Sequence, residues 1–173
     1  ERIVGEDGAD LPANEEGEIR IRGPNIMRGY YKLPEETKNA FDDQGYFRTG
    51  DMGHLDDDGF LHITGRIKEM LIIGGENVFP REIEEVLTNH PDVLAAGVVG
   101  RQDDSRGEVA VAFVELKEGA EFDEMALRSW CRESIATFKV PKTITLLQEL
   151  PRNPTGKIVR RALAELVQKD ITQ

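Results

Sequence analysis

Three short segments combine charged side chains with glycine or proline, a composition typical of loops that can carry chemistry. The first is residues 46–51, YFRTGD, in which Asp51 follows a glycine. A carboxylate on a glycine-flanked turn can accept two hydrogen bonds from a vicinal diol such as a ribose, and such charge-assisted bonds are about twice as strong as neutral ones. On spacing alone, an ordinary turn residue is the more frequent explanation for Asp51.

The second segment is residues 65–84, GRIKEMLIIGGENVFPREIE. Arg66 and Lys68 stand where the pattern of the chain changes, shortly before the pair Gly74-Gly75. Polar residues at a junction between domains can serve as a hinge, because a few positions there absorb a large backbone rotation. A solvated linker, a strand, a glycine turn and a proline-started helix explain the same residues without any function.

The third segment is residues 151–157, PRNPTGK, which ends on Lys157. Two prolines and a glycine predict an exposed loop, and a lysine on such a loop can bring a positive charge to a phosphate and withdraw it. The segment is not a phosphate-cradling P-loop, because Pro151 takes the place of the first glycine and Ile158 follows the lysine where Ser or Thr is required. An exposed lysine ahead of a helix is the alternative.

Composition narrows the class of protein. The formal charge of −11 disfavours a nucleic acid partner, because binding a phosphate backbone needs a basic face. No apolar run approaches the ~20 residues of a transmembrane helix. Cys131 is the one cysteine, so no internal disulfide or thiolate cluster is expected, and a reducing cytoplasm is the expected location. His54, His62 and His90 lack the spacing of metal ligands, and we expect no metal site in these residues.

The pattern of the chain predicts two parts. In the first, GEIRIR at 17–22 alternates as a strand does, Pro34 begins a short helix through Phe41, and residues 52–64 form a hairpin around Asp58-Gly59. After residue 65, strands and helices alternate. The expected strands are 70–73, 93–100, 109–116 and 143–147, and the expected helices start at Pro80, after Asp123 and at Ile158.

We therefore predict an α+β chain. Residues 66–173 are expected to form a small domain with a short mixed sheet flanked by helices. Residues 1–65 are expected to be an all-β end-piece of a larger N-terminal domain, because they have too little apolar surface to fold alone. A domain of about 105 residues is near the most common domain size.

The order and spacing of the segments are more specific than any one of them. GEIRIRGPNIMRGYY, YFRTGD, GRIKEMLIIGGENVFPREIEE, FKVPK and PRNPTGKIVRRAL together resemble the adenylate-forming superfamily, which contains acyl-CoA synthetases, nonribosomal-peptide adenylation domains and firefly luciferase. The resemblance runs from about residue 3 to residue 163. It implies that residues 1–65 end the large AMP-binding domain and that residues 66–173 are its small mobile C-terminal domain.

The resemblance implies an acid–thiol ligase. A carboxylate attacks ATP to give an acyl-adenylate and pyrophosphate, and the thiol of CoA then attacks the acyl carbon and releases AMP. The implied site residues are Lys157 as the catalytic lysine, Asp51 and Arg66 for the nucleotide, Lys68 as the hinge, and Gly74, Gly75 and Glu76 along the CoA tunnel. The phosphate loop, the Mg²⁺-binding glutamate and the acyl pocket are expected in a preceding domain, so we expect the isolated fragment to be inactive.

Departures from the family pattern indicate a subfamily. Luciferase and plant coumarate ligases carry lysines in a KxKG pattern, where this chain has Ile72-Ile73-Gly74-Gly75, so lysine assistance in the second step is absent here. The segment is more similar to bacterial acyl-CoA synthetases, and we expect ATP with Mg²⁺, CoA and a fatty or related carboxylic acid as ligands, with the chain's own N-terminal domain as partner. Two alternatives stay open: loading of a carrier-protein thiol, and a non-catalytic interaction module.

Overall fold

The computed structural model describes the backbone of residues 1–170 and the side chains of residues 1–168. The chain forms two compact units, Glu1–Lys68 and Glu69–Gln173. The sequence placed a boundary after residue 65, and the two units divide after Lys68. Among the helices that the structure describes, none has the length and apolar character needed to cross a bilayer.

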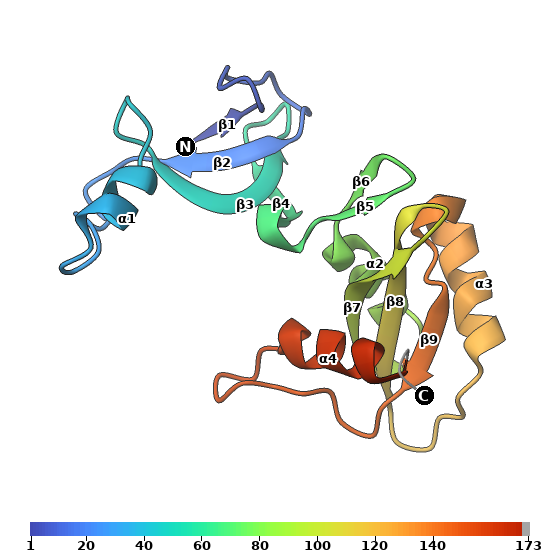
Figure 1. Cartoon of the computed structure of the whole chain (residues 1–173). Coiled ribbons are helices and arrows are strands. Elements are labelled where there is room, and N and C mark those ends of the chain that lie inside the picture. The colour runs from blue at the N-terminus through green and yellow to red at the C-terminus, as the bar shows by residue number, and fades with distance from the viewer. Residues whose placement is uncertain (171–173) are drawn as a thin grey trace. The chain divides into compact units, whose positions relative to one another are not determined.

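The first unit is built on an antiparallel sheet with strand order β1-β2-β3-β4 (Figure 1). Its elements are β1 (Arg2–Val4), β2 (Gly17–Ile21), α1 (Pro34–Asn39), β3 (Phe47–Leu55) and β4 (Leu61–Arg66). The predicted strand at 17–22 and the helix beginning at Pro34 are confirmed. The tight turn at Asp58-Gly59 is also confirmed, and Gly59 has φ +81°, a conformation that glycine adopts without steric cost.

The second unit contains a five-stranded sheet with order β6-β5-β8-β7, in which β9 also pairs with β8. Its strands are β5 (Leu71–Ile73), β6 (Glu76–Val78), β7 (Val93–Asp103), β8 (Gly107–Leu116) and β9 (Thr143–Leu146). The β8–β9 pair is parallel and the other pairs are antiparallel, so the predicted mixed sheet and α+β class are confirmed. Strand β6 was not predicted, because three residues that include polar Glu76 and Asn77 give no strand signal.

Helices cover both faces of this sheet (Figure 1). The helices are α2 (Pro80–Thr88), α3 (Glu124–Ser134) and α4 (Arg160–Asp170), with short 3₁₀ turns η1 (Ile67–Glu69) and η2 (Thr137–Lys139). Alternate residues of β7 and β8 supply two clusters: one packs against α2 and α3, and the other packs against α4. The sheet with its two helical layers is a scaffold on which the loops at its edges can be held rigidly.

Two residues help to determine where these helices begin and how they pack. The side chain of Asp123 accepts a hydrogen bond from the amide of Ala126 and caps α3, as expected of an aspartate at that position. Helix α4 lies so close to β7 that a Cβ on Gly97 would come within 2.5 Å of Leu163 Cδ1. Glycine at position 97 therefore permits the packing of α4, the helix that follows the Lys157 loop.

Candidate functional site

Asp51 lies inside strand β3 and not in a turn, so the expectation of a turn was wrong. The strand continues through this segment because it contains a bulge. Glu18 of β2 pairs with Met52 and Arg20 pairs with Arg48, so three residues of β3 lie opposite the single residue Ile19. Gly50, with φ +70°, supplies the left-handed residue that such a bulge accommodates.

Thr49 completes the hydrogen bonding of this bulge. Its hydroxyl donates to the carbonyl of Ile19 at 2.6 Å and accepts from the amide of Asp51 at 3.0 Å. The backbone of Asp51 is therefore fixed by side-chain hydrogen bonds at the place where the strand ladder is interrupted.

Asp51 and Arg66 face each other across β3 and β4. Arg66 Nε lies 2.8 Å from Asp51 Oδ1, and the two side chains are 51% and 27% exposed. An ion pair at this exposure contributes only about 0–1 kcal/mol, so a ligand can replace it at little cost. No other described residue donates to Asp51 Oδ2, which leaves that oxygen free to accept hydrogen bonds from a ligand hydroxyl.

Lys157 ends a loop that is organised by the side chain of Asn153. The Asn153 Oδ1 accepts from the amide of Thr155 at 3.0 Å, from the Thr155 hydroxyl at 2.8 Å and from the amide of Lys157 at 2.9 Å. The amide of Asn153 donates to the carbonyl of Lys157 at 2.9 Å, and Gly156 has φ +82°. The loop is thus a tight, hydrogen-bonded turn.

The base of this loop is attached to strand β8 through Arg152. One arm of its guanidinium donates to the carbonyl of Gly156 at 3.2 Å, and the other lies 3.3 Å from Glu115 Oε2. Glu115 also accepts from the amide of Leu150 at 3.3 Å. The Lys157 side chain is exposed, and its ammonium has no hydrogen-bond or ion-pair partner within the described part of the chain. A fixed loop therefore presents an unpaired cation to solvent.

Gly74 and Gly75 form the two-residue turn between β5 and β6, with φ +63° and +90°. Residues with a Cβ avoid this pair of left-handed conformations, which is the physical reason for two successive glycines. The amide of Gly74 donates to the carbonyl of Arg106 at 2.8 Å, and the amide of Ile72 donates to Glu108 Oε2 at 2.9 Å. The glycine turn is thereby fixed against the turn that joins β7 and β8.

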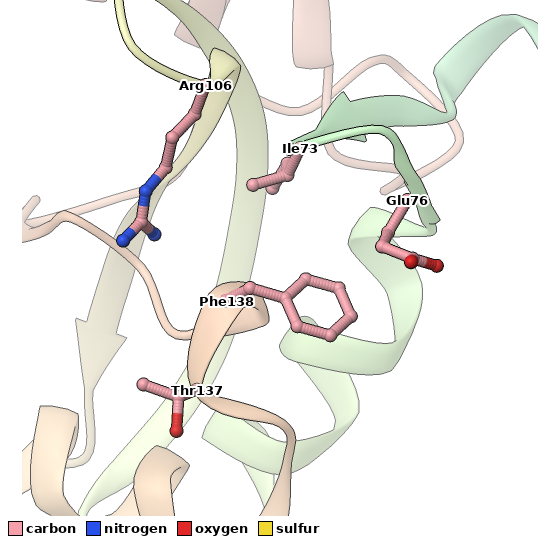
Figure 2. Close-up of a pocket in the computed structure, with 6 residues that line it drawn as sticks. Ile73, Glu76, Arg106, Thr137 and Phe138 are labelled. Carbon is pink, nitrogen blue, oxygen red and sulfur yellow. The ribbon is translucent and has the colours of Figure 1, made fainter.

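A cavity of about 440 Å³ lies at this place (Figure 2). It is lined by Ile73, Gly74, Glu76, Arg106, Thr137 and Phe138. Figure 2 shows Arg106 and Glu76 on opposite sides of the Phe138 ring, and the Arg106 guanidinium has no hydrogen-bond or ion-pair partner among the residues described. The cavity offers a glycine edge, the Phe138 ring, the Arg106 cation on one side and the Glu76 carboxylate on the other. The Arg106 side therefore suits the anionic end of a thin ligand.

Of the residues expected along a CoA tunnel, Gly74 and Glu76 line this cavity, whereas Gly75 is not among its lining residues. The sequence did not indicate the lining residues Arg106, Thr137 and Phe138. Phe138 belongs to the FKVPK segment, which carried the family resemblance without an assigned role. Arg106 follows Asp103, the last residue of β7, and Asp104 in the turn, and only the pairing of β5 with β8 brings it near the glycine turn. That pairing joins residues more than thirty positions apart, so no local pattern indicates it.

Two further expectations concern the hinge and metal ions. Lys68 is exposed and is the last residue of the first unit, in the 3₁₀ turn Ile67–Glu69. Over the described residues, no three or more His, Cys, Asp or Glu side chains are grouped so that they can hold a metal ion.

The chain is similar in sequence to a known protein family and to CoA ligases. Residues 82–157 match the family described as AMP-binding enzyme C-terminal domain. The chain is 48% identical over 169 residues to a 2-succinylbenzoate–CoA ligase of Geobacillus kaustophilus, covering 98% of this chain and 34% of that protein. It is 46% identical over 162 residues to a sulfoacetate–CoA ligase of Cupriavidus necator, covering 94% of this chain and 32% of that protein.

Among solved structures, ATP-bound MatB from Rhodopseudomonas palustris superposes with a TM-score of 0.90 at 39% identity. The match covers 99% of this chain and 34% of MatB. The chain thus spans about a third of the length of the relatives it matches.

Proposed function

Because the chain belongs to the adenylate-forming superfamily, we propose that the whole protein activates a carboxylic acid with ATP and transfers the acyl group to the thiol of CoA. The observation that carries the proposal is Lys157, an unpaired ammonium on a rigid exposed loop of a domain whose relatives include CoA ligases.

In the first half-reaction an oxygen of the substrate carboxylate attacks the α-phosphorus of ATP, and the bond from that phosphorus to the leaving pyrophosphate breaks. Two anions must approach, and negative charge builds on the phosphoryl oxygens. The ammonium of Lys157 offsets this charge, and groups that stabilise a transition state in this way typically contribute on the order of 10²–10³-fold in rate. Because Asn153 already fixes the loop, little ordering is needed when the lysine reaches the substrate.

We propose that Asp51 and Arg66 bind the nucleotide. Asp51 accepts hydrogen bonds from the ribose hydroxyls through its carboxylate, of which Oδ2 carries no other described partner. Arg66 keeps a donor for the nucleotide when the exposed ion pair opens. Exchange of one charge-assisted bond for another costs little, which suits a substrate that must also leave as AMP.

In the second half-reaction the thiol sulfur attacks the acyl carbon, and the bond from that carbon to the AMP oxygen breaks. We propose that rotation at Lys68 withdraws Lys157 and brings the cavity at Gly74 to the adenylate. The glycine turn lets a thin pantetheine chain lie against backbone, and Arg106 supplies a cation for a CoA phosphate.

The acid is proposed to carry a second anionic group. The sequence led us to expect a fatty or related acid, but the curated relatives are named for 2-succinylbenzoate and sulfoacetate, each of which has an anion beyond the reacting carboxylate. A fatty acid therefore has no support from these names. A panel of dicarboxylates, sulfonated acids and fatty acids, tested for acid-dependent turnover of ATP, separates the two expectations.

The experiment that tests the function uses the full-length protein that contains this chain. Acid-dependent exchange of pyrophosphate into ATP measures the first half-reaction, and mass spectrometry of acyl-CoA measures the second. We expect both activities, and we expect CoA to be preferred to a phosphopantetheinylated carrier protein. Absence of exchange with every acid of the panel would refute the proposal, and transfer to the carrier alone would replace CoA as acceptor.

A further inference from the structure

Helix α4 begins with Arg160, three residues after Lys157, and the guanidinium of Arg160 joins several parts of the second unit. Its Nε donates to Glu69 Oε2 at 2.9 Å, and its Nη2 donates to Glu84 Oε2 at 2.9 Å. Its Nη1 donates to Glu84 Oε1 and to the carbonyl of Val98, the latter at 3.3 Å. The Arg160 side chain is 26% exposed. Burial alone would lower the pKa of Arg160, but the bonds to Glu84 and Glu69 outweigh that effect and raise it.

Part of this cluster has a structural explanation. Strand β7 is an edge of the sheet, and the outward amide and carbonyl of Val98 need partners. Glu84 accepts from the Val98 amide at 2.7 Å, and Arg160 donates to the Val98 carbonyl. The Arg160–Glu84 pair therefore closes the sheet edge and fixes α2 to α4.

The contact with Glu69 is not needed for that purpose. Glu69 is the first residue of the second unit and follows Lys68 directly. Arg160 is connected to the Lys157 loop through its neighbour Val159, whose amide donates to the carbonyl of Pro151 at 2.8 Å. One guanidinium thus joins the residue after the hinge to the base of the loop that carries the catalytic lysine.

We propose that Arg160 is a positioning residue, which fixes Glu69 so that rotation is confined to Lys68 and moves Lys157 as part of one rigid body. This inference rests on the proposed function. Without the bond, rotation spreads over the residues after Lys68, and the lysine arrives over a wider range of positions. Misplacement by about 1 Å can cost on the order of 10²-fold in rate. Acyl transfer depends less on the bond, because Arg106 is proposed to contact a CoA phosphate and not the reacting atoms, so that step tolerates a wider range of positions of this unit.

Glu69→Ala in the full-length protein tests the proposal, since it leaves the Arg160–Glu84 pair intact. Glu165→Ala is the matched control, because Glu165 pairs with an arginine of the same helix at 3.2 Å and is exposed. We expect Glu69→Ala to lower the turnover number for pyrophosphate exchange by about 10-fold, with an unchanged KM for ATP. Thioester formation from supplied acyl-adenylate should stay within about two-fold of wild type, and the control should match wild type in both assays.

A second variant tests whether Glu69 acts through Arg160. Arg160→Lys keeps the charge but loses the planar fork that bonds to acceptors on three residues, so adding Glu69→Ala to it should cause no further loss of exchange. Additive losses, wild-type exchange in Glu69→Ala, or equal loss of both half-reactions would each overturn the proposal.

A readout independent of activity separates this inference from the proposed function. Hydrogen–deuterium exchange of the amides of residues 67–71 should accelerate by roughly 5-fold or more in Glu69→Ala and not in Glu165→Ala. If wild-type protein shows no pyrophosphate exchange, the proposed function fails, and the amide measurement alone then decides whether Arg160 restrains the hinge. Unchanged amide exchange in Glu69→Ala would refute that restraint.

Discussion

The two units differ in how the charges of their candidate site residues are paired, although both units contain ion pairs. In the first unit, Asp51 is paired with Arg66, and the carboxylate of Asp42 contacts both Arg2 and Arg20. In the second unit, Lys157 and Arg106 lack a partner among the described residues, although the chain has 33 acidic residues against 22 Lys and Arg. A paired site binds by exchanging partners, whereas an unpaired cation in an acidic chain is available for an incoming anion.

Removing the free ammonium should give the largest effect. Lys157→Ala in the full-length protein is expected to lower pyrophosphate exchange on the order of 10²–10³-fold, because the other cation of the loop, Arg152, is already paired with Glu115. Thioester formation from supplied acyl-adenylate should be retained. Lys142→Ala is the control, since Lys142 is an exposed lysine of the same unit. Equal loss of both half-reactions would contradict a role confined to adenylation.

Fixing the hinge should reverse that pattern. Lys68→Pro restricts φ at the last residue of the first unit and is expected to lower acyl transfer on the order of 10-fold or more while sparing adenylation. Lys68→Ala controls for the lost side chain and should support both steps. Single-turnover measurements of each half-reaction check this, and loss of adenylation in the proline variant would argue against a hinge at position 68.

Removing the second unpaired cation, Arg106, should weaken the use of CoA as acceptor without changing adenylation. Arg106→Gln removes a charge-assisted bond to a CoA phosphate and is expected to raise the KM for CoA by about 10-fold or more, with pyrophosphate exchange unchanged. Pantetheine, which has no phosphate, provides the control acceptor. Wild type and variant should use it equally, and a defect that persists with pantetheine would assign Arg106 another role.

Loosening the Lys157 loop should lower pyrophosphate exchange less than removing the lysine does. Asn153→Ala removes three hydrogen bonds from the Lys157 loop, each with a net contribution of about 0.5–1.5 kcal/mol, and should lower exchange by roughly 5–10-fold. Asn153→Asp retains the accepting oxygen and should restore most of the rate. If Asn153→Ala exchanges like wild type, the lysine does not need an ordered loop.

The sequence predicted what depends on local pattern and missed what depends on pairing between distant residues. Gly74-Gly75, Pro80 and Asp123 each impose a local conformation, and the structure has the expected turn, helix start and cap. The bulge at Asp51 was missed because it depends on the register of β3 against β2.

Arg160 was missed for the same reason. Its partner Glu69 is 91 positions away in the sequence, and both residues read as ordinary surface charges. Motif spacing therefore predicts which residues form the candidate site, but the contacts that hold them in position follow from the tertiary fold.

Neutralising Asp42, which is paired with Arg2 and Arg20 in the first unit, should change the stability of the protein and not its catalysis. Burial alone would raise the pKa of Asp42, but hydrogen bonds from the Tyr46 amide, Arg20 and Arg2 outweigh it and lower the pKa to about 2. The folded state therefore favours the ionised carboxylate. Its contribution is complete above the unfolded pKa, 3.8 for an unperturbed aspartate, and is lost as the pH falls through about 2.

Asp42→Asn should accordingly lower the melting temperature of the full-length protein at pH 7. The difference from wild type should shrink as the pH falls from about 4 toward 2, because wild type then loses the same charge. Asp43→Asn, at the exposed neighbouring position, should match wild type throughout. Thermal unfolding measured at a series of pH values checks this, and a difference that does not vary with pH would mean that the Asp42 hydrogen bonds, and not its charge, stabilise the first unit.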